Sequence, residues 1–252
     1  MSNKPRTSST VSTALRALRL LAEFPHGVGI TEVARRLDVG KSTAHLLLST
    51  LVEQDFVERT DDSRYRLGIT AFEVGSAVPD SAKFGGALIT PMQTLADLSG
   101  EAVSLAIIRG RDAIIVQRFE TKHILRAEIG VGTRMPLISC ASGKFLLAHM
   151  PESQVEILYP NEALQRVTVR SVRTKKELIA MFPTIREQGY AVNSNEYADG
   201  VTGIATGIVD ARGNYDAALS VAGPTSRFEG EQWLEPLAQA AHTMSGLLAG
   251  KR

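Results

Sequence analysis

Residues 30–54 read ITEVARRLDVGKSTAHLLLSTLVEQ, and this stretch decides the fold of the first part of the chain. From residue 41 onward the apolar positions recur at helical spacing and form one face, made of Ala44, Leu47, Leu48, Leu51 and Val52. A shorter amphipathic pattern precedes it, carried by Ile30, Val33, Ala34 and Leu37, and Asp38-Val39-Gly40 separates the two. Two short helices joined by a tight glycine-containing turn predict a helix-turn-helix, whose second helix enters the DNA major groove. A plain helical hairpin has the same spacing, so the neighbouring residues must decide between the two.

The residues that follow favour a DNA-binding domain. Residues 56–60 and 64–68 are short runs around the turn Asp61-Asp62-Ser63, which predicts a β-hairpin. A helix-turn-helix followed by a hairpin is a winged helix, and its second strand would carry Arg64 and Arg66 toward phosphate or the minor groove. Upstream, a third helix is predicted from the apolar stripe Val11, Ala14, Leu15, Leu18 and Ala22.

Charge supports this prediction only locally. Residues 1–22 contain basic side chains, among them Arg6, and no acidic one, which fits a DNA-binding arm, although solvated termini commonly have such composition. The net charge of the chain is only +1, and residues 1–75 carry ten Lys and Arg against nine Asp and Glu. The DNA-binding prediction therefore depends on the motif and not on bulk basicity.

Length and composition limit the classes of protein to which the chain can belong. With 252 residues, the chain is long enough for two domains, each with a core of its own. Its apolar content of 44% is ordinary for a globular protein, and no apolar run approaches the length of a membrane span. The N-terminus lacks the apolar region of a signal peptide. The single cysteine, Cys140, excludes internal disulfides and suits a reducing cytoplasm, so we expect a cytoplasmic protein.

The second part of the chain predicts a sheet with helices packed on it. Residues 68–81 mix Gly, Ser and Pro and indicate a domain boundary, and a helix with Pro91 inside it, which would kink it, is predicted from the stripe Phe84, Ala87, Leu88, Met92, Leu95 and Leu98. Three consecutive antiparallel strands are then predicted at 101–108, 112–120 and 123–129. Helices follow at 142–150, 152–159 and 174–188, strands at 190–195, 201–210 and 215–222, and a last helix at 229–248. This order of elements indicates an α+β sandwich.

The common sequence motifs of catalysis and of cofactor binding are all incomplete or absent. Gly40-Lys41-Ser42 lacks the first glycine of a phosphate-binding loop, Gly130-Val131-Gly132 lacks the third glycine of a dinucleotide fingerprint, and no Gly-x-Ser-x-Gly elbow occurs. The five histidines have no metal-ligand spacing. Cys140 could be a nucleophile, but a lone cysteine is more often a small buried hydrophobe, and no base accompanies it in sequence. We therefore expect no catalytic residue, no metal and no cofactor.

Segments in both halves of the chain carry a family resemblance. Residues 11–24 (VSTALRALRLLAEF), 29–59 (GITEVARRLDVGKSTAHLLLSTLVEQDFVER) and 64–68 (RYRLG) resemble the DNA-binding domain of the IclR family of bacterial transcriptional regulators, with a departure at Leu46, where relatives often carry an arginine. Residues 130–148 (GVGTRMPLISCASGKFLLA) and 189–228 (GYAVNSNEYADGVTGIATGIVDARGNYDAALSVAGPTSRF) resemble its C-terminal signatures. The resemblance implies an α+β, two-domain protein: a flexible arm at 1–10, a winged helix-turn-helix at 11–75, a linker helix at 76–100 and a GAF-like α/β sandwich at 101–252.

The resemblance also implies two sets of site residues. Contacts to DNA are expected from Lys41, Ser42, Thr43, His45, Ser49, Arg64, Arg66 and Arg6. An effector site is expected from the apolar residues Ile124, Ala127 and Met135 and from the polar and backbone side Ala141, Ser142, Asn193, Val201, Gly203, Ser220 and Ala222. Relatives that bind small keto acids have an acidic residue at 193, Cys at 203 and Ser at 222. The smaller and less polar residues here suggest an aromatic or mid-sized organic acid.

The expected mechanism is control of DNA affinity by this acid. A homodimer, or a dimer of dimers, would place recognition helices on a palindromic operator. Since many members of the resembled family are repressors, we expect a repressor. No membrane partner is expected. Two alternatives stay open, a metabolite sensor or scaffold that does not bind DNA and an enzyme with an appended helical domain.

Overall fold

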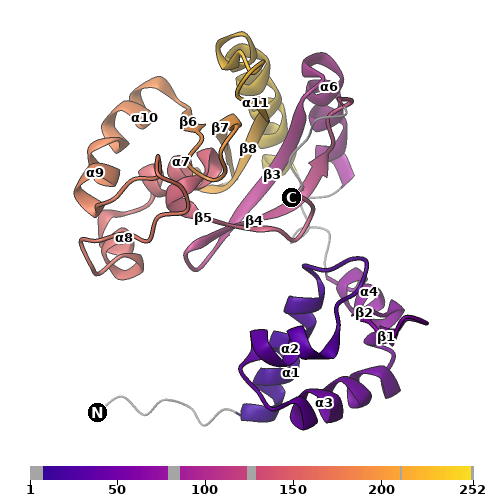
Figure 1. The fold of residues 1–252 in the computed structure, drawn as a ribbon. Coiled ribbons are helices and arrows are strands. Elements are labelled where there is room, and N and C mark those ends of the chain that lie inside the picture. Colours follow the sequence, from indigo (N-terminus) through magenta and orange to yellow (C-terminus); the bar gives the residue numbers. More distant parts are fainter. Residues whose placement is uncertain (1–7, 79–85, 124–128, 211, 251–252) are drawn as a thin grey trace. The chain divides into compact units, whose positions relative to one another are not determined.

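The structure is a computed structural model and describes residues 8–78, 86–123, 129–210 and 212–250. The chain divides between residues 82 and 83 into two compact units (Figure 1), which are described separately. No helix of the described residues has the length and apolar character that crossing a bilayer requires.

The first unit is a winged helix-turn-helix. Its elements are α1 (Ser9–Leu21), α2 (Ile30–Leu37), α3 (Lys41–Glu53), β1 (Val57–Arg59), β2 (Tyr65–Leu67) and α4 (Ile69–Ser76). The turn between α2 and α3 forms because Asp38 adopts the left-handed conformation, with φ of 57°, and ends α2. The antiparallel hairpin β1–β2 forms the wing. The predicted helix pair, turn and hairpin are confirmed.

The buried face of α1 differs from the predicted one. Val11 and Leu15 were expected in the core, yet both are more than half exposed, whereas Ala17, Leu20 and Leu21 are buried. The three buried residues pack with Val33 and Leu37 of α2, Leu47 and Leu48 of α3, and the hairpin residues Val57 and Tyr65. Because α1 is apolar on more than one side, its own sequence does not decide which side is buried, and packing against α2, α3 and the wing does.

The segment between the two units also differs from its prediction. Residues 69–76, expected to belong to an irregular boundary, form α4, which has no buried residue. The next described elements are the short 3₁₀ helix η1 (Gly86–Leu88) and α6 (Ile89–Ser99), whereas Phe84 lies outside the described residues. Pro91 was predicted inside the helix, but it is the third residue of α6 and lies in its first turn. The first turn of a helix has no intrahelical partner for its N–H groups, so the proline requires no kink there.

A six-stranded antiparallel sheet organises the second unit. In spatial order the strands are β5 (Arg134–Pro136), β4 (Asp112–Phe119), β3 (Ala102–Arg109), β8 (Tyr215–Pro224), β7 (Val201–Val209) and β6 (Ala191–Ser194). The predicted strands at 101–108, 112–120, 190–195, 201–210 and 215–222 are confirmed within a few residues. Most of the strand predicted at 123–129 lies outside the described residues, and the short strand β5 was not predicted.

Helices cover both faces of this sheet (Figure 1). On one face, α6 and α11 (Leu234–Ala249), the latter preceded by η3 (Gly230–Trp233), pack on Val103, Leu105, Ile107, Leu219 and Val221. The other face bears η2 (Leu137–Ser139), α7 (Ala141–His149), α8 (Glu152–Leu158), α9 (Lys175–Ala180) and α10 (Phe182–Gln188). The α+β fold class is thereby confirmed.

Several predicted details of these helices are wrong. The helix expected over 174–188 is broken at Met181 into α9 and α10, because Pro183 occupies the first turn of α10 and cannot continue α9. The helix expected over 229–248 begins as the 3₁₀ helix η3. Leu98, predicted to lie on the apolar stripe of its helix, is exposed, and Ala96 is buried instead.

The α7-facing side of the sheet is built from small residues. Alternate positions on the central strands are Ala102, Ser104, Ala106, Gly203, Ala205, Gly207, Ala218, Ser220 and Ala222. The ring of Phe145 on α7 lies where a side chain at Gly207 would be, so the helix packs closely on this part of the face. Ser220 and Ala222 lie two and four residues after Ala218, which pairs with Gly207. Both are partly exposed although β8 is a central strand.

Candidate DNA-binding and effector sites

The outer face of α3 carries the predicted recognition residues. Ala44, Leu47 and Leu48 hold the inner face in the core of the first unit. Because an α-helix has 3.6 residues per turn, the positions between these buried residues point outward. All five predicted contact residues of α3 are exposed: Lys41, Ser42, Thr43, His45 and Ser49. Leu46 shares this outer face and is 71% exposed. Nδ1 of His45 and Oγ of Ser49 are 3.4 Å apart, one turn along the helix.

The start of α3 suits an anion. Gly40 is the N-cap residue and provides no side-chain hydrogen bond, and the first turn contains no acidic residue. Backbone N–H groups at such a helix start lack intrahelical partners and carry partial positive charge. Together with the ammonium group of Lys41, they can hold a phosphate.

The predicted arginines of the wing are already paired with acids. Arg66 lies opposite Glu58 in the hairpin register and forms an ion pair with it. Nε of Arg64 is 3.2 Å from Oδ2 of Asp62, and its guanidinium also donates to the Gly27 carbonyl. All four ion-pairing side chains are about half exposed or more, so these pairs are weak and can exchange for phosphate.

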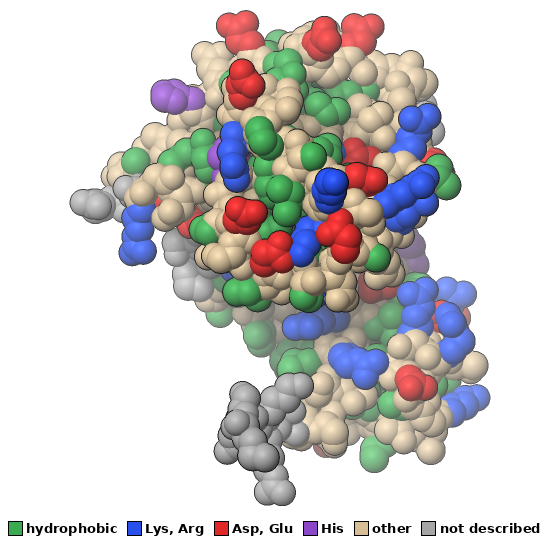
Figure 2. Space-filling view, turned by 90° about the vertical axis from the view of Figure 1, so that its left-hand side faces the viewer, with side chains coloured by type: hydrophobic (Ala, Val, Ile, Leu, Met, Phe, Trp, Pro, Cys, Tyr) green, Lys and Arg blue, Asp and Glu red, His purple; other side chains and the backbone are tan. Residues whose placement is uncertain are grey.

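Arg59 is a basic wing residue that the sequence analysis missed. Its guanidinium donates to Oγ of Ser63 over 3.0 Å and lies over the Tyr65 ring, and no ion pair of Arg59 occurs within the part of the chain that the structure describes. The signal in the sequence was its position at the end of the first predicted strand, beside the turn. Figure 2 shows both basic and acidic side chains on one face, in agreement with the net charge of only +1.

The predicted effector residues come from three parts of the second unit. Ala141 and Ser142 are buried at the N-terminus of α7, where Cys140 is the cap and its sulfur accepts a hydrogen bond from the Gly143 N–H. Gly143 is required there, because a Cβ would clash with the Leu137 carbonyl oxygen. The remaining described members lie on the sheet.

Strand register places most of the sheet residues side by side. Asn193, Gly203 and Ala222 are directly paired across β6, β7 and β8, and Ser220 lies on the same face two residues before Ala222. Val201 is at the start of β7 and pairs with Pro224. Met135 is buried in β5, on the α7 side but three strands away from β8. Arg6, Ile124 and Ala127 lie outside the described residues.

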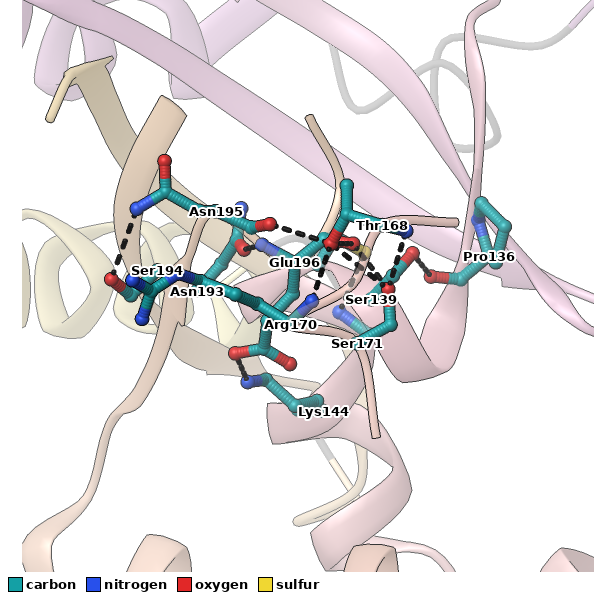
Figure 3. Close-up of polar contacts among 12 residues, drawn as sticks. Pro136, Ser139, Lys144, Thr168, Arg170, Ser171, Asn193, Ser194, Asn195 and Glu196 are labelled. Carbon is teal, nitrogen blue, oxygen red and sulfur yellow. Dashed lines mark hydrogen bonds and ion pairs between the residues drawn. The ribbon is translucent and has the colours of Figure 1, made fainter. Parts of the chain in front are cut away.

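A buried ion pair, not predicted from the sequence, lies beside this set. Lys144 of α7 pairs with Oε1 of Glu196, which follows β6, and the lysine side chain is only 1% exposed (Figure 3). The Glu196 N–H donates to Oδ1 of Asn193 over 2.9 Å, and the Ser171 hydroxyl donates to the Glu196 carbonyl over 2.7 Å. Oε2 of Glu196 is buried and has no hydrogen-bond partner within the described residues. The signal in the sequence was a lysine inside an otherwise apolar helix.

A pocket of about 420 Å³ occurs elsewhere in the second unit. Its lining comprises Arg111, Asp112, Pro136, Ile138, Tyr159, Pro160, Asn161, Ala163, Leu164, Gln165, Arg166 and Val167. No predicted effector residue belongs to this lining. The pocket therefore does not support the predicted effector set, which depends on strand register and on the start of α7.

Cys140, the candidate nucleophile of the sequence, is buried. Burial raises the pKa of the Cys140 thiol to about 12, so it stays protonated and a poor nucleophile at neutral pH. No group of three or more His, Cys, Asp or Glu side chains that could hold a metal occurs among residues 8–78, 86–123, 129–210 and 212–250.

Comparison with known proteins places the chain in a family. Residues 10–61 match the IclR helix-turn-helix domain, and residues 86–246 match the bacterial transcriptional regulator IclR C-terminal domain. The HTH-type transcriptional repressor AllR of Salmonella paratyphi A is 32% identical over 230 residues, which cover 90% of this chain and 84% of AllR.

Solved structures have the same fold. An IclR transcriptional regulator from Alicyclobacillus acidocaldarius superimposes with a TM-score of 0.80 at 26% identity and covers 97% of this chain and 100% of its own. An IclR homolog from Microbacterium hydrocarbonoxydans complexed with 4-hydroxybenzoate gives a TM-score of 0.81 at 24% identity, over 95% of this chain and 99% of that one. The chain therefore belongs to the IclR family of bacterial transcriptional regulators.

Proposed function

We propose that this protein is a transcriptional repressor whose affinity for a palindromic operator is controlled by a small organic acid bound in the second unit. The observation that carries the DNA-binding part is the outer face of α3, where Lys41 and four other predicted contact residues are exposed beside an acid-free helix start. Membership of a family of regulators supports the same function.

The effector class follows from the sizes of the predicted site residues. Gly203 and Ala222 carry no side chain larger than a methyl group, and Ser220 supplies a hydroxyl. The Asn193 side chain accepts from the Glu196 N–H through its oxygen, and its amide N–H groups, which have no partner among the described residues, can donate to an anion. We therefore assign a mid-sized, partly apolar acid, such as a benzoate, in preference to pyruvate or glyoxylate.

Control of DNA binding requires differential affinity. The acid must bind one arrangement of the DNA-binding units more tightly than another, because a ligand with equal affinity for both shifts no equilibrium. A homodimer, or a dimer of dimers, supplies the two recognition helices that a palindromic operator needs.

The test is DNA retardation with the region upstream of the protein's own gene, with unrelated DNA of equal length as the control. Specific binding that one of a panel of aromatic and aliphatic acids releases supports both parts of the proposal. Specific binding that no acid changes removes the effector part. Equal retention of both DNAs contradicts the operator part.

A sensor or scaffold that does not bind DNA is the second candidate, favoured by the exposed Leu46 on α3 and by the acids paired with Arg64 and Arg66. Binding of an acid without any specific DNA binding at low salt would support it. The enzyme alternative would require turnover of a bound acid that is lost when Ser142 or Cys140 is substituted.

A further inference from the structure

Arg118 places a buried guanidinium on the small-residue face of the sheet. It is directly paired with Ser104 of β3, which is in turn directly paired with Ser220 of β8, so the three side chains share one face. The neighbouring residue Phe119 packs on the opposite side, with the cluster around α6 and α11. The Arg118 side chain is only 5% exposed.

Two polar groups occupy this guanidinium in the structure. Nη1 of Arg118 donates to Oγ of Ser104 over 2.8 Å. Nε donates to Oε1 of Glu120 over 2.7 Å, and Nη2 donates to Oε2 over 3.3 Å, which is the two-pronged arrangement that a carboxylate adopts with arginine. The carboxylate of Glu120 thus neutralises a charge that would be costly to bury alone.

The partner of Arg118 is unusually accessible for a buried cation. Lys144, whose side chain is 1% exposed, is a second buried cation, but its partner Glu196 is only 12% exposed and is further held by Asn193, Thr168 and Ser171 through its backbone. Glu120 is 44% exposed and follows the last residue of β4. A carboxylate at the surface regains its hydration when it rotates into water, so the Glu120 position is open to exchange with another carboxylate that keeps the buried guanidinium paired.

Hydrogen bonds and register connect Arg118 to the predicted effector residues. The Ser220 hydroxyl donates to the Ser104 carbonyl over 3.3 Å, and the next row along the same face runs through Ala102, Ala222 and Gly203. Adjacent strands are about 4.8 Å apart, so Ser220 is roughly 10 Å from β4, within reach of an extended arginine side chain and a small acid together.

We infer that Arg118 is the anion-binding group of the effector site. Until an effector binds, the Glu120 carboxylate occupies the position on Arg118 that the effector carboxylate takes. The effector carboxylate takes the position of Glu120 on Nε and Nη2, while Ser104 keeps holding Nη1. This inference rests on the proposed function, because it assigns the charge recognition of the same organic acid.

The test is calorimetric titration of the full-length protein with 4-hydroxybenzoate, benzoate and pyruvate, and with 4-hydroxybenzamide as the uncharged analogue. For the acid that binds, Arg118→Gln should lower the affinity at least tenfold. Glu120→Gln should raise it several-fold, because the competing charge is gone. Affinity for the amide should change little in either variant. Arg109→Gln, the same exchange at the other end of the sheet, is the matched control and should bind like the parent.

The outcomes separate this inference from the proposed function. If the parent protein binds none of the acids, the effector class itself is wrong and the assignment of Arg118 falls with it. If the parent binds an acid and Arg118→Gln binds it equally, only the role of Arg118 is overturned. Should Arg118→Gln fail to fold, judged by circular dichroism, Glu120→Gln decides, since unchanged or weaker acid binding in that variant contradicts the exchange.

Discussion

Lys144 and Glu196 are separated by 52 positions in the chain, yet they form a buried ion pair that joins α7 to the segment after β6. The side chain of the lysine is 1% exposed and that of the glutamate 12%. The pair fixes the N-terminal half of α7 against the segment after β6, whose Glu196 N–H donates to Asn193 of that strand, and therefore holds two parts of the predicted effector site together.

Loss of one member of this pair should destabilise the second unit strongly. Lys144→Met leaves a buried carboxylate without its counter-ion, which typically costs about 3–5 kcal/mol in the free energy of unfolding. Urea unfolding measures it, and Lys175→Met is the control, because its partner Glu156 is 48% exposed and the loss there should stay near 1 kcal/mol. Equal effects of the two substitutions would show that burial of the Lys144 pair has no energetic consequence.

Lys41 should contribute to DNA binding alone. Lys41→Ala removes a cation from an acid-free helix start, so operator affinity should fall roughly tenfold and the salt dependence should lose about one counter-ion. Retardation at several salt concentrations measures both, and acid binding should match the parent. Lys122→Ala, which removes an exposed lysine from the second unit, is the control. Unchanged operator affinity would remove Lys41 from the interface.

The wing should bind DNA more tightly when Arg66 is released. Glu58→Gln removes the acid that pairs with Arg66 and removes a negative charge from the wing, so operator affinity should rise several-fold. Arg66→Ala should lower it, and the double variant should resemble Arg66→Ala. If Glu58→Gln raises affinity equally with and without Arg66, the effect is one of net charge and the arginine has no contact.

Cys140 should be inert in the folded protein. Burial raises the pKa of its thiol to about 12, so Ellman's reagent at pH 8 should react only after unfolding in urea. The thiol of the unfolded chain ionises near pH 9, its ordinary pKa, whereas the buried thiol stays protonated up to about pH 12. Ionisation therefore stabilises only the unfolded state between these pH values, and the free energy of unfolding falls as pH rises from 9 toward 12. At pH 10 this loss is about 1.4 kcal/mol, and Cys140→Ala should lack it. Rapid labelling of the native protein would contradict this burial.

Gly143 should tolerate no side chain. Gly→Ala in a helix ordinarily stabilises by about 1 kcal/mol, but a Cβ at Gly143 would clash with the Leu137 carbonyl, so Gly143→Ala should destabilise the protein. Gly246→Ala in α11 is the matched control, because no atom lies within 4 Å of its Cβ position and the substitution should be neutral or stabilising. Thermal unfolding distinguishes them, and two shifts of the same sign would refute the clash.

The sequence predicted elements well where one periodicity dominated. In α3 the apolar stripe has a single possible face, and Ala44, Leu47 and Leu48 are buried as expected. In α1 two stripes compete, and Val11 and Leu15 were placed on the wrong side because only tertiary packing selects between them. Pro91 was misjudged because its effect depends on where the helix begins, which the residues around it do not mark.

The candidate sites depend more on long-range pairing than on local pattern. Exposure of Lys41 and His45 follows from the period of α3, so the outer face of the recognition helix could be predicted. The pairing of Arg66 with Glu58 needs the hairpin register, and that of Arg118 with Ser104 needs the sheet. No sequence period relates Lys144 to Glu196, so their ion pair could be found only in three dimensions.

The two faces of the central sheet are under different constraints. Val103, Leu105 and Leu219 pack against α6 and α11 through bulky side chains, whereas the other face carries Gly203 and Ala222, which belong to the proposed effector site. Because a Cβ at Gly203 would lie 3.0 Å from the Cβ of Ala222, these two positions must change together. Such coupled changes would alter the proposed effector site while the face that carries α6 and α11 keeps its side chains.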